Sequence, residues 1–261
     1  MPLVALPIAM GLFLAAPPPG DAPPDTEEYR LVDMMVAQVD TTVITLSELL
    51  AEARLVLLRT RGPEIARTAP ITEDFLHAVL RSMLNRELLL GEARRLQLRE
   101  VAEAEVDAGI EELRSRFSSS ADYVRFLERI GFGPPRSAAG HTSRGAPPGL
   151  VAIVRAELLV TRFINLRIRP AVVVRDSEVL RCYELNRAIL GGEPLTAVRP
   201  VIEQNLRERR QDAALRELLG QLEKRASLRL AASFDLHGQP MPAEAEPGSL
   251  AIRCPLEESK P

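Results

Sequence analysis

The sequence predicts a mainly α-helical domain of six or seven helices, with a small pair of strands that joins the two ends of the chain. Apolar residues recur at helical spacing through most of its length. Short segments typical of strands lie near the beginning, VAQV at 36–39, and near the end, SLRL at 227–230. Aromatic residues make up 4% of the chain and Trp is absent, so Leu, Ala, Val and Ile must fill the core, as in packed helices.

The first predicted structure is a short strand pair or a bent strand over residues 36–45. Apolar and polar side chains alternate there around Asp40-Thr41. A tight type I′ turn is not expected, because β-branched Thr41 tolerates a positive φ poorly, at a cost of about 1–2 kcal/mol. The chain should therefore reverse at Asp40-Thr41 by another route.

Start and stop signals divide the rest of the chain into helices. Thr45 and Glu48 form a T-x-x-E capping box, and Thr72 is a second N-cap candidate. Gly131 and Pro170 are stop signals further along the chain. Helices are predicted from Thr45 to about Arg61, from Thr72 through Leu88, over about 102–117 and 121–130, from Leu150 to Arg169, from Asp176 to Leu190, and from Pro194 to about Ala226. The polar run RERRQD should divide the last helix into two contact zones.

Composition divides the chain into a leader, a spacer, one domain and a tail. Residues 1–22 resemble a secretory leader, and 23–33 are a Pro-rich, acidic spacer that should be disordered. The helical domain spans 34–230 and contains a Gly- and Pro-rich loop insertion at 131–149. The tail, 231–261, is again Pro-rich and is expected to be disordered.

The apolar run Val4–Ala16 predicts export. It is shorter than the roughly 20 residues that a membrane-spanning helix needs, and small residues and prolines follow it. No Cys follows the run, so a lipoprotein anchor is not indicated. We therefore expect a periplasmic protein with no stable membrane insertion after the leader is removed.

The capped helix after VAQV, together with the long helical run and closing strand over 199–230, resembles the N-terminal chaperone domain of the SurA family. The likeness covers residues 34–230. In that family the beginning and end of the chain fold into one body, with prolyl-isomerase (parvulin) domains inserted between them. At the insertion point this chain has only residues 175–198, which are too few for such a domain.

The resemblance implies an ATP-independent chaperone, a holdase that binds unfolded outer-membrane or secreted polypeptides without a cofactor. Two alternatives come from other classes of protein. One is a peptidyl-prolyl isomerase, which the missing parvulin domain disfavours. The other is a structural subunit of an envelope complex, which would use the same helical faces for one fixed partner.

Charge and motif content disfavour several other functions. The formal net charge is −3, and the basic residues are interleaved with acidic ones, so nucleic acid is not the expected partner. His77, His141 and His237 are far apart in sequence, and no H-E-x-x-H or C-x-x-C motif occurs. Gly191-Gly192 reads as a helix stop rather than a phosphate loop. No catalytic or metal-binding residue is therefore predicted.

Two sets of residues remain as site candidates. Aromatic side chains gather in and just after the helices at 102–130 and could line a groove for unfolded chain, although a place in the core is the favoured interpretation. They are Phe117, Tyr123, Phe126 and Phe132. The only cysteines, Cys182 and Cys254, are a disulfide candidate, since an exported protein would permit the bond without requiring it.

Overall fold

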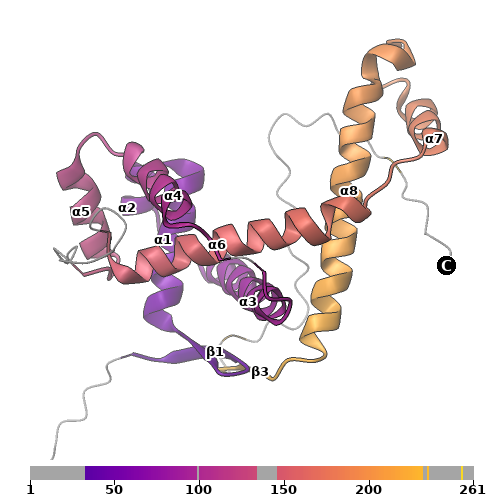
Figure 1. Ribbon diagram of the computed structural model, residues 1–261. Helices are drawn as coiled ribbons and strands as arrows, with labels where there is room; N and C mark the ends of the chain where they lie inside the picture. The colour runs from indigo at the N-terminus through magenta and orange to yellow at the C-terminus, as the bar shows by residue number, and fades with distance from the viewer. Residues whose placement is uncertain (1–32, 99, 134–145, 232–233, 235–253, 255–261) are drawn as a thin grey trace, which may run out of the picture. The chain divides into compact units, whose positions relative to one another are not determined.

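The computed structural model describes residues 33–98, 100–133, 146–231, 234 and 254 (Figure 1). The predicted mainly α-helical class is confirmed, because these residues form eight α-helices and one three-stranded sheet. In chain order the elements are β1 (Met35–Val39), β2 (Thr42–Thr45), α1 (Leu46–Arg61), α2 (Pro63–Thr68), α3 (Glu73–Arg95), α4 (Glu103–Ser115), α5 (Ser120–Arg129), α6 (Pro148–Arg167), the short 3-10 helix η2 (Arg169–Ala171), α7 (Asp176–Asn186), α8 (Leu195–Glu223) and β3 (Leu228–Leu230).

The sheet joins the two ends of the domain, as the sequence predicts. Its order is β2-β1-β3, and β1 is antiparallel to both neighbours, so the last strand pairs with the first (Figure 1). Ala37 of β1 lies opposite Ile44 on one side and Leu230 on the other. Ala37 and Ile44 are buried, and this row of side chains forms the apolar face of the sheet.

The turn between β1 and β2 also holds the start of β3. Asp40 has a φ of 50°, and Thr41 is not among the described residues with a positive φ. A type I′ turn needs a positive φ at both central residues, so this turn is of another type, as the sequence predicts. The Asp40 N–H donates to the Ser227 carbonyl at 2.8 Å, and the Ser227 N–H donates to Asp40 Oδ1 at 2.8 Å.

The predicted helix starts are observed at both capped positions. Thr45 and Glu48 form the reciprocal capping box of α1, and the Thr72 hydroxyl accepts from the N–H of Phe75 in α3. Helix α2 is not among the predicted helices. Gly62, with a φ of 84°, ends α1, and Pro63 then occupies the first position of α2, where its missing N–H costs no hydrogen bond.

Buried apolar side chains form three clusters. The first lies among the sheet, α1, α3 and the C-terminal parts of α6 and α8. The second lies among the C-terminal half of α1, α2, α4, α5 and the N-terminal half of α6. The third lies between α7 and the N-terminal part of α8 and consists of Val179, Cys182, Leu190, Ile202, Leu206 and Cys254.

Helix α8 has the two contact zones that its sequence predicts. Ile202 and Leu206 belong to the third cluster, and Leu222 belongs to the first. The polar run at 207–212 separates them. The C-terminal zone packs against α3 and the sheet, whereas the N-terminal zone packs against α7. One helix therefore links two regions with different cores.

The expectation of a disordered tail is wrong at two positions. Phe234 is buried in the first cluster, and its ring lies edge-on to His77 with 5.7 Å between the ring centroids. Cys254 is buried in the third cluster. Burial of both side chains removes apolar surface from water, which is favourable. The Pro-rich composition around them does not indicate this burial. The rest of the tail after residue 231 lies outside the described residues, as do the leader at 1–22 and the spacer at 23–32.

The predicted loop insertion at 131–149 is shorter than expected at its C-terminal end. Helix α6 begins at Pro148, two residues before the predicted start, because proline is well suited to the first helical turn. Ala146, two residues before the start of α6, is buried in the second cluster. Residues 134–145 lie outside the described residues.

Candidate functional site

The four aromatic candidates form part of the second cluster. Tyr123 and Phe126 are buried, and the half-buried Phe117 lies 5.6 Å from the first ring and 5.3 Å from the second, centroid to centroid. Phe132 packs closely over Gly149, where an added Cβ would lie 3.1 Å from its ring. Burial raises the pKa of Tyr123 to about 12. These rings therefore fill the core and do not line an open groove.

Two surface hollows of small volume occur in the part of the chain that the structure describes. One, of about 260 Å³, lies between α3, the end of α8 and the β1–β2 turn, and includes Glu87, Glu92 and Arg225. The other, of about 290 Å³, lies between α1, α4 and α6 and includes Arg116 and Glu157. Both are lined by many charged side chains, unlike the mostly apolar pockets that bind small organic ligands.

A buried charged network borders the second hollow. Arg86 of α3 donates a hydrogen bond to Glu52 of α1 at 2.7 Å and lies 3.5 Å from Glu157 of α6. The carboxylate of Glu157 also accepts hydrogen bonds from Nη1 and Nη2 of Arg59, at 2.7 and 2.8 Å. Burial raises the pKa of Glu157 although Arg59 opposes the shift. Because α1, α3 and α6 each contribute a charge, the network fixes these three helices relative to one another. We assign it a structural role.

The histidines do not come together in the described chain. His77 lies on α3 beside Phe234, with Nε2 4.0 Å from Glu73 Oε1, and His141 and His237 lie outside the described residues. Within those residues no group of three or more His, Cys, Asp or Glu side chains is arranged to hold a metal ion. The same residues include no helix with the length and apolar character that crossing a membrane requires.

The most distinctive surface feature is a concentration of exposed apolar side chains in residues 166–201, which we call the exposed apolar segment. It contains the six most exposed large hydrophobic side chains of the described residues, since the next, Ile65, is 45% exposed. The six are Val173 (68%), Leu185 (63%), Leu166 (61%), Ile189 (51%), Val201 (49%) and Leu180 (47%). Single exposed hydrophobic residues are normal in soluble proteins, whereas exposed apolar side chains that gather together mark binding surfaces, so the six residues make this segment the candidate binding surface.

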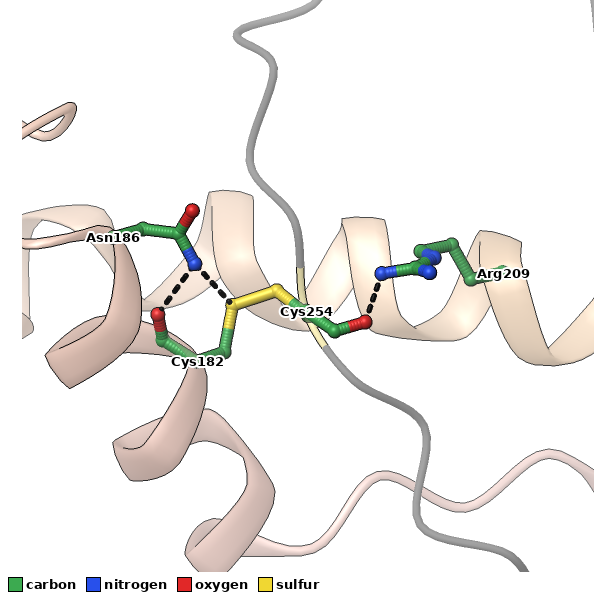
Figure 2. The surroundings of a disulfide bond; sticks show 4 residues. All are labelled: Cys182, Asn186, Arg209 and Cys254. Carbon is green, nitrogen blue, oxygen red and sulfur yellow. Dashed lines mark hydrogen bonds between the residues drawn. A yellow bond between two sulfur atoms is a disulfide. The ribbon is translucent and has the colours of Figure 1, made fainter.

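Most of this segment belongs to the α7–α8 hairpin, which we define as residues 174–210. Its core is the third cluster, and a disulfide between Cys182 and Cys254 closes it, with 4.9 Å between the two Cα atoms. Figure 2 shows Asn186 on one side of the bond, where its Nδ2 donates to the Cys182 carbonyl at 2.8 Å. On the other side, Arg209 donates to the Cys254 carbonyl.

A buried ion pair fixes the base of the hairpin. Glu178 of α7 is buried and accepts from Arg210 of α8, which also donates to the carbonyl of Val173. A charge-assisted pair that is shielded from water resists separation better than an exposed one. The ion pair therefore joins α7 directly to α8, and the disulfide joins α7 to Cys254, whose carbonyl accepts from Arg209 of α8, while apolar side chains remain on the outer sides.

This surface is not among the sites predicted from the sequence, although the sequence contains a signal for it. In α7, the buried residues are Glu178, Val179, Cys182 and Asn186. Leu180 and Leu185 are not among them, so α7 carries more apolar residues than one buried face requires. Counting apolar residues that fall outside each helical stripe would have marked this helix.

Comparisons with known proteins do not place the chain in a family. No protein-family model matches it, and none of the curated proteins is detectably similar to it in sequence. The exposed apolar segment and the α7–α8 hairpin are therefore the features on which a function can be proposed.

Proposed function

We propose that this protein is an ATP-independent chaperone that holds unfolded polypeptides, and that the exposed apolar segment is its binding surface. The observation that carries the proposal is the position of the six most exposed large hydrophobic side chains, all within residues 166–201. An unfolded polypeptide exposes apolar side chains of its own, and covering both sets removes apolar surface from water at about 25 cal/mol per Å².

The arrangement of these side chains suits clients of many sequences. Leu180 and Leu185 are five residues apart on α7, which separates them by roughly 140° around the helix axis. They therefore offer separate small contacts on two sides of the helix, not one shaped pocket. Several weak apolar contacts that act together give binding with little demand on client sequence, because no single contact requires a particular partner.

The fold supports the same proposal through the resemblance to the SurA family. In that family the two chain ends form one body, and here β1 pairs with β3. We therefore propose a SurA-like chaperone without the parvulin domain, which acts in the periplasm on outer-membrane or secreted polypeptides. Its mechanism is non-covalent: binding of client competes with the association of clients with one another, and no bond is made or broken.

Light scattering of a denatured outer-membrane porin diluted into buffer tests the proposal. The purified chain should suppress aggregation at near-stoichiometric ratios without ATP. The variant L166S/L185S should need at least about threefold more protein for the same suppression, because two exposed apolar contacts are lost. The matched control I65S/L96S changes two exposed apolar side chains outside the segment and should behave as the unchanged protein.

Two outcomes would contradict the proposal. A chain shown to be folded by circular dichroism that does not suppress aggregation would indicate a dedicated partner in place of many clients. Equal losses in L166S/L185S and I65S/L96S would show that residues 166–201 are not the binding surface.

A further inference from the structure

We infer that the Cys182–Cys254 disulfide is the condition on which the α7–α8 hairpin folds, so that the chain presents the part of the exposed apolar segment that lies in the hairpin only after oxidation. This regulation rests on the proposed function, whereas the folding of the hairpin does not depend on it. Four properties of the hairpin lead to this inference: the size of its core, the origin of Cys254, the length of the loop that the bond closes, and the burial of the two sulfur atoms.

The core of the hairpin is small. Among the described residues the third cluster has six buried members, compared with sixteen in the first and fourteen in the second. Two of the six are the cysteines themselves. A helix of the length of α7 is marginal without packing, and so small a core offers little apolar burial to order it.

Cys254 completes this core from outside the hairpin. The other members of the cluster, together with the half-buried Val174, Tyr183, Leu195 and Val198 that pack against it, all lie within residues 174–206. Cys254 is bonded covalently to α7 and accepts a hydrogen bond from Arg209 of α8 (Figure 2). One residue of the tail thus links the two helices and closes their shared core.

The bond closes a long loop, which increases its effect on folding. The cysteines are separated by 72 residues, and a cross-link over such a distance removes much of the conformational freedom of the unfolded chain. Without the bond, docking of Cys254 onto the hairpin would carry that entropic cost with only one small side chain to offset it.

Formation of the bond requires an oxidant. The two thiols lose two protons and two electrons to a disulfide-bearing oxidant, which is itself reduced to a dithiol, and such exchange partners act in oxidising compartments. Once formed, both sulfurs are buried, since Cys182 and Cys254 are almost without exposed surface. A dithiol reductant can then reach them only when the hairpin opens, so the oxidised hairpin persists.

Hydrogen exchange on the full chain tests this inference. The samples are the oxidised protein, the protein refolded in a dithiol reductant, and the variant C182A/C254A, which keeps small apolar side chains but cannot form the bond. In the last two, amides of α7 and of residues 195–206 should exchange roughly 100-fold faster or more, while amides of α1 and α3 stay unchanged. The matched control F234A removes Phe234, the other buried side chain among the described positions of the tail, and should leave α7 exchange unchanged.

Porin aggregation is measured on the same samples. Suppression should fall in parallel with the loss of protection in α7, and reductant should have no effect on C182A/C254A. The inference is overturned if α7 exchanges at the same rate with and without the bond, or if suppression survives when α7 has lost its protection. If no sample suppresses aggregation, the proposed function fails, and the exchange rates still decide whether the disulfide folds the hairpin.

Discussion

The two ends of helix α8 are held in different ways. At its C-terminal end, Leu222 joins a core of sixteen buried residues that the sheet, α1, α3 and α6 share. At its N-terminal end, Ile202 and Leu206 join a core of six, which a disulfide closes. Noncovalent burial is extensive in the first region and small in the second, and we therefore expect a covalent bond to contribute most in the second.

The two regions also differ in how much of their apolar surface they bury. The region around the first and second clusters encloses its aromatic side chains and its charged network. The hairpin instead has apolar side chains on its outer sides, and a short helix cannot bury residues on every side. The proposed client-binding surface is therefore located where the core is smallest, and we infer that the disulfide compensates for what that core lacks.

Among the variants that test this comparison, Phe234→Ala should change the free energy of unfolding most. The substitution removes a buried ring from the first cluster and should lower the free energy of unfolding by about 3 kcal/mol. Thermal unfolding followed by circular dichroism should show a melting temperature lower by roughly 6–12 °C. Because Phe234 does not contact the third cluster, α7 should keep its exchange protection. An equal loss of protection in α7 would show that the two regions unfold as one.

A smaller effect is expected from Asp40→Ala at the junction of the chain ends. The variant loses the carboxylate that accepts from the Ser227 N–H at 2.8 Å, and alanine tolerates the φ of 50° less well. We expect a loss of about 1–2 kcal/mol in urea unfolding. Asp40→Asn is the matched control, since asparagine retains an acceptor oxygen and tolerates positive φ, and it should stay within about 0.5 kcal/mol of the unchanged protein. Similar losses in both variants would refute the role of this contact.

The smallest effect concerns Asp33 at the beginning of the described domain, whose carboxylate accepts hydrogen bonds from the Ser47 hydroxyl and N–H and from the Met34 N–H. The Ser47 and Thr45 hydroxyls lower the pKa of Asp33 to about 2. A carboxyl whose folded pKa lies below its unfolded value of 3.8 stabilises the fold above that value, and the contribution is lost as the pH falls toward 2. Carboxyl NMR titration should show the Asp33 pKa rising toward 3.8 in Ser47→Ala.

Asp122 provides an internal control for that titration. The Ser119 hydroxyl, the Ser118 hydroxyl and Arg125 lower its pKa, and none of these groups changes in Ser47→Ala. Its titration should therefore be the same in both proteins. A common shift of both carboxyls would show a general change in the fold and not the loss of one hydrogen bond.

Local signals in the sequence predict most of the fold. The capping box of Thr45 and Glu48 begins α1, and alternation over VAQV together with SLRL predicts the β1–β3 pair. The signals fail where contacts depend on distant residues. Phe234 and Cys254 lie in Pro-rich surroundings that predict disorder, and their burial depends on α3 and α7, which local composition does not report.

The candidate site was harder to predict than the fold. The sequence presents the four aromatic residues as possible groove residues and favours a place in the core for them, and in the structure they pack in and against the second cluster. The exposed apolar segment contains no aromatic residue among its six most exposed side chains. The segment is defined by apolar side chains that lie outside the buried stripe of each helix. These side chains can be identified only when the packed face of each helix is known.

Photocrosslinking tests most directly whether residues 166–201 bind client. A photoreactive phenylalanine analogue is placed at Leu185, or at Ile65 as the exposed control outside the segment, and each protein is mixed with unfolded porin and irradiated. If residues 166–201 bind client, we expect strong crosslinks from position 185, their loss in the reduced protein, and few crosslinks from position 65. Crosslinks of equal yield from both positions, or from position 65 alone, would contradict this expectation.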